Sequence, residues 1–215
     1  MTTKTARPPT ALQLLAAFGL LVLMALDWRL AATTAVALAL VFPPAPLRPA
    51  ALGPTLGPTL GRALGAYAIW LLVWVAFAAA YLRAMAAVGQ PLEPQTQLLE
   101  LAQHGSAVPD FWARVALIVV AAPLIEEVVF RGYLYAAAVR LAPVWLAQAV
   151  VAALFGLAHG LAHALPIAVL SLVFGYLRQR HGCLLPSMVA HATHNALTVS
   201  LVVCWPSLLD LLYAR

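Results

Sequence analysis

Long apolar runs recur along the whole 215-residue chain, and this feature limits the possible folds more than any other. Hydrophobic residues make up 64% of the chain and charged residues only 9%, whereas a soluble domain carries about 25% charged residues. The runs approach the ~20 residues with which a helix crosses a bilayer, and the alternating segments typical of an outer-membrane barrel do not occur. We therefore expect an all-α transmembrane bundle of about six to eight helices, built as a single integral-membrane domain.

Two short apolar runs, residues 11–26 and 30–42, open the chain. They form either a tight helical hairpin or one long tilted helix, and we prefer the hairpin because it places more basic residues on the cytoplasmic side. The Pro- and Gly-rich stretch 43–61 follows, with the repeat LGPTLGPTLG, and predicts an irregular linker. The chain is thus divided into an N-terminal hairpin with its linker, residues 1–62, and a helical core, residues 63–215.

The core holds the remaining apolar segments and an acidic loop. The segments are residues 63–88, 111–139, 143–159, 164–177 and 184–204. With the N-terminus in the cytoplasm, the basic residues near the span ends fall mostly inside and the acidic loop 89–110 falls outside, as the positive-inside rule requires. Cys183 and Cys204 bracket the last segment and lie about 30 Å apart along a helix, so they do not pair with each other.

Several ionisable or amide side chains lie within the apolar segments and not at their ends, and the ones that bear on function fall in the last hundred residues. They are Glu126, Glu127, Arg131, His159, His163, His191, His194 and Asn195. An ionised group near the bilayer centre costs a few kcal/mol, so each of these must face protein or trapped water. At about 1.5 Å per helical residue, Glu126, His159 and Asn195 reach a similar depth on three different helices. The shared depth predicts one polar cavity.

Two adjacent carboxyl groups in this set have different surroundings. Glu127 and Arg131 are spaced i,i+4 and share a helix face, which predicts a structural ion pair. Glu126 points about 100° away from Glu127, and it has no basic residue three or four positions later. It is a candidate general base, with a protonated structural acid as the alternative.

The histidines and the asparagine allow two kinds of chemistry. His159 ends the sequence FGLAH and either helps to activate a water molecule or joins neighbouring helices by a hydrogen bond. His191 and Asn195 are spaced i,i+4 and offer two donors that suit a developing oxyanion. Alternatively, Glu126, His159, His191 and a water molecule make a plausible zinc set.

Several other assignments are excluded or carry less weight. The sequence lacks HExxH, GxSxG and GxGD, which argues against zincin, serine-hydrolase and aspartyl types of intramembrane site. No basic stripe or phosphate-binding glycine loop is present, so nucleic acid is not an expected partner. We expect structural roles for His163 and His194, and solvated loop positions for His104 and His181.

Three short motifs together resemble one protein family. EEVVFRG at residues 126–132, FGLAH at 155–159 and HATHN at 191–195 are similar to the EExxxR, FxxxH and HxxxN motifs of the CAAX-protease and bacteriocin-processing family, also called CPBP or Abi. Each motif alone is weak, but they occur in the family's order, one on each helix. The resemblance covers roughly residues 117–200.

This resemblance implies an all-helical intramembrane endopeptidase. Glu126 would be the base, His159 would help it to activate water, His191 and Asn195 would hold the oxyanion, and the Glu127–Arg131 pair would brace the site. No cofactor is expected, although zinc remains the alternative, with Glu126, His159 and His191 as ligands. The expected partners are a membrane-anchored protein or peptide substrate and the lipid bilayer, for a multi-pass protein of a bacterial inner membrane. The other readings are a non-catalytic bacteriocin-immunity or peptide-binding protein and, with less support, a proton or metal transporter.

Overall fold

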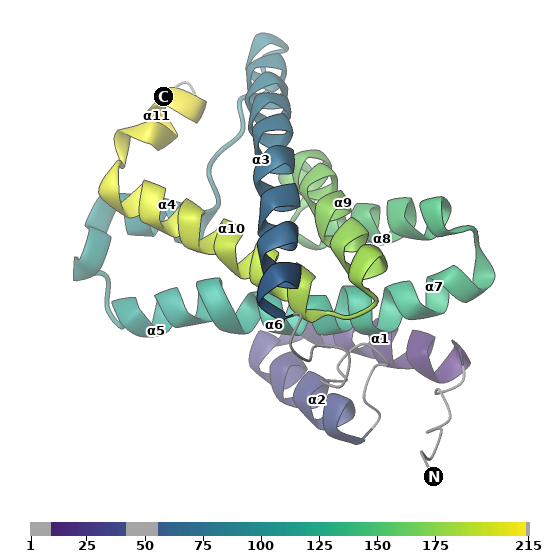
Figure 1. Ribbon diagram of the computed structural model, residues 1–215. Coiled ribbons are helices and arrows are strands. Elements are labelled where there is room, and N and C mark those ends of the chain that lie inside the picture. Colours follow the sequence, from purple (N-terminus) through teal and green to yellow (C-terminus); the bar gives the residue numbers. More distant parts are fainter. Residues whose placement is uncertain (1–9, 42–55, 214–215) are drawn as a thin grey trace.

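A computed structural model describes residues 10–41 and 56–213, and Figure 1 shows them as an assembly of helices. Every regular element in these residues is helical and none is a strand, which confirms the all-α prediction. The helices are α1 (Thr10–Leu26), α2 (Trp28–Val41), α3 (Leu56–Ala87), α4 (Thr96–His104), α5 (Phe111–Ala116), α6 (Ala122–Glu127), α7 (Tyr135–Leu141), α8 (Val144–Ala158), α9 (Ala164–His181), α10 (Leu185–Cys204) and α11 (Ser207–Tyr213).

The helical run 111–141 is continuous. It joins α5, α6 and α7 through two π-helical segments, η4 (Leu117–Ala121) and η5 (Val128–Leu134). When this run is counted once, the described residues form nine helices. The short helix α4 lies in the expected acidic loop, α11 follows the last expected apolar segment, and the other seven helices fall within the expected number.

Two helices of the described residues are long and apolar enough to cross a membrane, namely Leu56–Ala87 and Leu161–His181. A third span results if α10 and α11, which are bent by 107° at their junction, are counted together. The second of these spans ends later than the segment 164–177 that we expected. It includes Arg178, Arg180 and His181 in its last turn, where positive side chains stabilise the carbonyl end of a helix. His181 was therefore wrongly expected in a loop.

The linker prediction is wrong for residues 56–61, which form the first turns of α3. Pro58 is the third residue of this helix. The first N–H groups of a helix have no carbonyl partner, so a proline in the first turn removes no hydrogen bond. The rest of the predicted linker, residues 42–55, lies outside the described residues.

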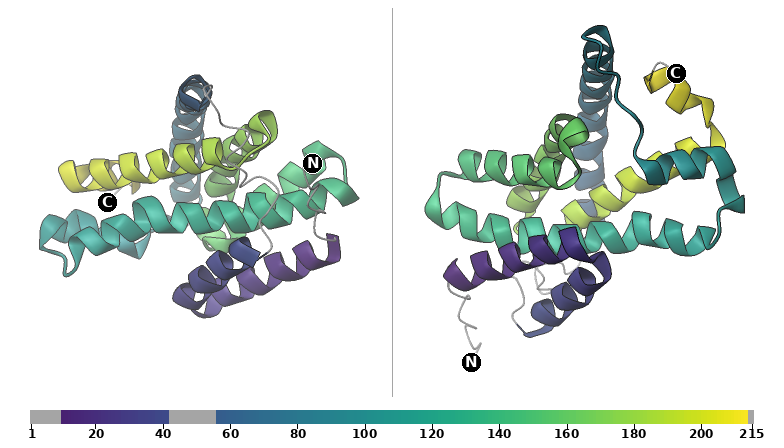
Figure 2. Two further views of the ribbon diagram at one scale, coloured as in Figure 1. Left: turned by 60° about the horizontal axis from the view of Figure 1, so that its bottom comes forward. Right: turned by 180° about the vertical axis from the view of Figure 1, so that it is seen from behind.

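The helices α1 and α2 meet at Asp27 and turn back beside each other, against one side of the run 111–141 (Figures 1 and 2). Their apolar side chains join the core formed with this run and with α8. Buried members of this core include Leu20, Phe130 and Phe155. The remaining long helices pack on the other side of the run, so the carboxyl groups of α6 lie inside the assembly.

The helices α3 and α9 pack antiparallel, and side chains of α3 donate hydrogen bonds to backbone carbonyls of α9 and of the short turn that precedes it. Trp74 Nε1 donates to the Pro166 carbonyl at 2.8 Å, and the Tyr81 hydroxyl donates to the Ala162 carbonyl at 3.1 Å. Pro166 has no N–H with which to bond the carbonyl four residues earlier. That carbonyl belongs to Ala162, so the Tyr81 hydroxyl satisfies an acceptor that the proline leaves open.

A single glycine allows α8 and α9 to approach closely. A Cβ atom at Gly156 would collide with the backbone carbonyl of Ala164. Gly160, four residues later, has open space around it but a φ of +93°, a conformation that other residues rarely adopt. The first glycine therefore permits close helix packing, and the second permits the turn that follows His159.

Candidate active site

The two π-helical segments flank α6, which carries both carboxyl groups of the EExxxR motif. Each π-turn places one additional residue in the helical ladder and shifts the side chains that follow it around the helix. Such insertions are rare and occur frequently at functional sites. Here they set the directions in which Glu126, Glu127 and Arg131 leave one continuous helix.

Glu127 is fully buried and lies at the centre of a charged cluster. Its Oε1 accepts hydrogen bonds from Arg131 Nη1 at 2.8 Å and from His191 Nδ1 at 3.1 Å. The i,i+4 ion pair predicted from the spacing is thus present. Glu127 also orients His191, because the bond to Nδ1 directs the opposite ring nitrogen, Nε2, away from the ion pair.

Arg131 connects this cluster to α9 and to two aromatic rings. Its Nη2 donates to the Ser171 hydroxyl at 2.6 Å and to the Ser171 carbonyl at 3.1 Å. The guanidinium carbon lies 4.5 Å from the centre of the Phe155 ring and 5.4 Å from that of Phe174. A cation between aromatic faces is stabilised by their negative π-surfaces, so the charge of Arg131 is compensated by one carboxylate and two rings.

Glu126 faces the two histidines of the other motifs. Its Oε2 lies 3.7 Å from His191 Nε2 and 3.9 Å from His159 Nε2. The side chain of Glu126 is 14% exposed and that of His159 is 26% exposed, whereas that of His191 is 5% exposed. The three groups therefore meet at the edge of the buried cluster, and Glu126 and His159 form its more exposed side.

Hydrogen bonds at the other ring nitrogens fix the orientation of both histidines. His159 Nδ1 lies 2.7 Å from the Phe155 carbonyl. A carbonyl oxygen only accepts, so this nitrogen carries the proton and the neutral ring has its lone pair on Nε2. His191 donates from Nδ1 to Glu127 in the same way, and its ring stacks on Phe174 at 4.5 Å with an interplanar angle of 18°. Both Nε2 atoms thus point toward the carboxyl group of Glu126.

Asn195 lies one turn after His191 on α10, but its side chain forms its hydrogen bond with a backbone carbonyl and not with Glu126 or Glu127. Its Nδ2 donates to the Ile118 carbonyl, inside the π-helical segment η4, at 2.8 Å. In a π-turn the N–H groups bond five residues back instead of four, which leaves a nearby carbonyl for another donor. The asparagine therefore ties α10 to the helix that carries Glu126.

The other two histidines of the spans lie away from this site. His194 is buried, with its Nδ1 3.1 Å from the Tyr67 hydroxyl and its ring 4.8 Å from that of Trp74. His163 faces the ring of Tyr213 at 6.4 Å. Both environments agree with the structural roles expected for these residues.

Two residues of the site were missed by sequence reasoning. Ser171 accepts from Arg131, and Phe174 stacks on His191. Both belong to α9, which carries none of the three motifs. Their spacing of three residues places them on one face of that helix, but the sequence alone does not indicate which partner the face meets.

The side chains of Glu126, His159 and His191 are of the kinds that bind zinc. Within the described residues, however, no group of three or more His, Cys, Asp and Glu side chains is spaced to hold a metal ion. The atoms of the three groups are 3.7 and 3.9 Å apart, whereas adjacent ligands in a tetrahedral site with bonds of about 2.0–2.1 Å would be about 3.4 Å apart. Both separations are longer than this ligand spacing.

Comparison with known proteins assigns the segment that carries this geometry. Residues 108–197 match the family described as type II CAAX prenyl endopeptidase Rce1-like. This segment is Rce1-like. It contains all three motifs and confirms the resemblance to the CAAX-protease family. No curated protein and no solved structure matches the chain.

The Rce1-like segment spans 90 of the 215 residues of the chain. The matched family is one of peptidases, and together with the apolar helices the match indicates an integral membrane protein. The N-terminal hairpin, α3 and the C-terminal helix α11 lie outside the matched residues.

Proposed function

We propose that the chain is an intramembrane endopeptidase that hydrolyses a peptide bond of a membrane-associated protein or peptide. The observation that carries this proposal is the meeting of Glu126 Oε2 with the Nε2 atoms of His159 and His191 at 3.9 and 3.7 Å. These separations are too long for direct hydrogen bonds, but one water molecule can contact all three groups. The proposed setting is a bacterial inner membrane crossed several times by the chain.

Glu126 and His159 activate this water. The carboxylate of Glu126 and the lone pair on His159 Nε2 both accept hydrogen bonds, so a water molecule between them can donate one hydrogen bond to each. As the water oxygen attacks the carbonyl carbon of the peptide, Glu126 takes one of the two protons. It then gives this proton to the nitrogen of the leaving amine, the C–N bond breaks, and the products are a new carboxyl group and a new amine.

His191 and Asn195 stabilise the oxygen of the tetrahedral intermediate. A protonated His191 donates from Nδ1 to Glu127 and presents a second N–H at Nε2. With Glu126 and Glu127 ionised and Arg131 and His191 protonated, the cluster carries no net charge, which suits a site surrounded by apolar helices. A carboxamide has two N–H donors, so the bond from Asn195 to Ile118 leaves one for the oxyanion.

The mechanism proposed here needs no metal ion, because each proton transfer uses a group of the chain itself. Direct tests are the metal content of the purified protein and its response to a chelator. We expect sub-stoichiometric zinc and unchanged cleavage after treatment with 1,10-phenanthroline. Loss of cleavage that added zinc restores would assign Glu126, His159 and His191 to a zinc site instead.

Hydrolysis itself is tested with purified protein in liposomes and a candidate substrate found in cells. Membrane proteomes of strains with and without the active chain should differ in an uncleaved membrane-anchored precursor that accumulates when the chain is absent. The purified protein should then cut this precursor at the same bond, as mass spectrometry of the products would show. If no precursor accumulates and no purified candidate is cut, a binding or immunity role replaces hydrolysis.

A further inference from the structure

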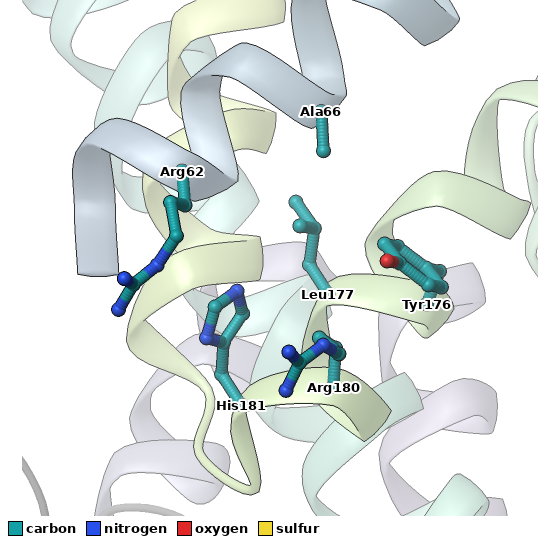
Figure 3. Close-up of a pocket in the computed structure, with 6 residues that line it drawn as sticks. All are labelled: Arg62, Ala66, Tyr176, Leu177, Arg180 and His181. Carbon is teal, nitrogen blue, oxygen red and sulfur yellow. The ribbon is translucent and has the colours of Figure 1, made fainter. Parts of the chain in front are cut away.

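A second polar feature lies between the first turns of α3 and the last turns of α9, as a pocket of about 420 Å³. It is lined by Arg62, Ala66, Tyr176, Leu177, Arg180 and His181. Figure 3 shows the side chain of Arg62 descending from α3 toward His181 and Arg180 of α9. Residues separated by more than a hundred positions in the chain thus form one basic site.

The positive charge of this pocket has no compensating carboxylate. Arg62 and Arg180 form no ion pair with any acidic side chain of the described residues. All seven Asp and Glu residues of the chain lie within the described part, and none of them lines the pocket. An anion from outside the chain would therefore remove the repulsion between the cations.

Stabilisation of a helix end by positive charge does not by itself explain why the basic side chains of this pocket converge. Arg180 and His181 occupy the last turn of α9, where positive charge stabilises the free carbonyls. Arg62 comes from a different helix, in its first two turns, where positive charge has no such benefit. Arg62 lies close to the basic end of α9 because α3 and α9 pack against each other.

The pocket also lies where a lipid head group would be found. Both helices that form it are long and apolar enough to cross a membrane, and their antiparallel packing brings the start of one to the end of the other. Tyr176, Arg62 and Arg180 are exposed at this end. Basic pockets between transmembrane helices on the cytoplasmic side bind anionic head groups, and guanidinium groups match the geometry of phosphate oxygens.

We propose that Arg62, Arg180 and His181 bind the phosphate of an anionic phospholipid head group. The site is separate from the Glu126 cluster and does not depend on the proposed hydrolysis. Removing one arginine should weaken lipid binding about fivefold, and removing both should weaken it on the order of 25-fold.

The test is native mass spectrometry of the full chain released from a neutral detergent with added phosphatidylglycerol or phosphatidylcholine. The variants are Arg62→Gln, Arg180→Gln and the double variant. Arg83→Gln is the matched control, because Arg83 is an exposed arginine near the other end of α3. All substituted side chains are exposed, and thermal unfolding monitored by tryptophan fluorescence verifies that each variant is folded.

We expect the wild type and Arg83→Gln to retain phosphatidylglycerol in preference to phosphatidylcholine, and the double variant to lose this preference. Equal retention of phosphatidylglycerol by all variants would overturn the proposal, as would equal binding of the two lipids by the wild type. Displacement of phosphatidylglycerol by an equal concentration of inorganic phosphate would assign the site to a free anion and overturn its assignment to lipid.

Discussion

The two polar regions of this protein handle charge in opposite ways. In the cluster around Glu127, each buried charge has a partner within the chain: Arg131 is held by Glu127, Ser171 and two aromatic rings, and His191 by Glu127. In the pocket between α3 and α9, Arg62, Arg180 and His181 converge without a carboxylate. A compensated cluster can hold reactive groups in fixed positions, whereas an uncompensated one favours an anion from outside.

Within the compensated cluster, the two neighbouring carboxyl groups have different contacts. Glu127 is bound on one oxygen by two donors and is fully buried. In the part of the chain that the structure describes, no hydrogen bond holds Oε2 of Glu126, which faces two ring nitrogens at longer distances. In the proposed mechanism the first carboxylate supports the site and the second accepts a proton. The following substitutions separate these roles, beginning with the largest expected effect.

Replacing His159 by alanine should lower the rate of peptide cleavage by about 10²–10⁴-fold, the range for losing a proton-transfer group. The protein should remain folded, since the ring lies at the end of α8 and is partly exposed. Cleavage of a fluorogenic membrane peptide in liposomes measures the effect, with His104→Ala on the exposed end of α4 as the control. Wild-type rates in His159→Ala would remove this histidine from the mechanism.

Replacing Glu127 by alanine should destabilise the protein by about 3–5 kcal/mol, because Arg131 would remain buried without its carboxylate. Thermal unfolding in detergent measures this effect. The double variant Glu127→Leu, Arg131→Met should recover much of the stability, since apolar residues can replace a buried ion pair. It should stay inactive, because His191 has lost the acceptor at Nδ1. Full activity of the double variant would contradict the positioning role of Glu127.

Replacing Asn195 by alanine should reduce cleavage by about 10²–10³-fold, as expected for the loss of one oxyanion donor. The variant also loses the bond to Ile118, so unfolding is measured in parallel. Thr198→Ala is the control on the next turn of α10, because the Thr198 hydroxyl donates within its own helix, to the His194 carbonyl. A fall in stability without a fall in the rate per folded molecule would leave Asn195 with a packing role alone.

Replacing Gly156 by alanine should have the smallest effect, about 1–3 kcal/mol of destabilisation, because the new Cβ meets the Ala164 backbone and overpacking forces α8 and α9 apart. His159 follows within one turn, so its distance from Glu126 should also change. Gly65→Ala in α3 is the control, since its Cβ would meet nothing within 4 Å. Equal stability of the two variants would contradict the close packing at Gly156.

Much of the site could be predicted because its groups are polar residues in an apolar sequence. Glu126, His159 and His191 stand out in the spans, their helices are separate, and the i,i+4 spacing of Glu127 and Arg131 fixes a local ion pair. Long-range packing was harder to predict. Ser171 and Phe174 lie on a helix without a motif, and the π-helical segments around α6 have no periodicity that separates them from an ordinary helix.

The first turns of α3 were missed for a different reason. Repeated Gly and Pro residues predict a linker by composition, yet the structure uses Pro58 at a position where a helix needs no N–H. The basic pocket follows from the same extension of α3, since Arg62 lies in its second turn. Its approach to Arg180 depends on antiparallel packing, which single-sequence patterns do not give.

The central claim is that the carboxyl group of Glu126 moves the proton of the attacking water. The most direct measurement is the cleavage rate of Glu126→Gln in liposomes, because glutamine keeps the shape of the side chain and cannot accept this proton. Glu100→Gln, at an exposed glutamate paired with Arg114, provides the same substitution outside the site. We predict that Glu126→Gln is folded and inactive while Glu100→Gln cleaves at the wild-type rate. Full activity of folded Glu126→Gln would contradict the assignment of this residue as the base.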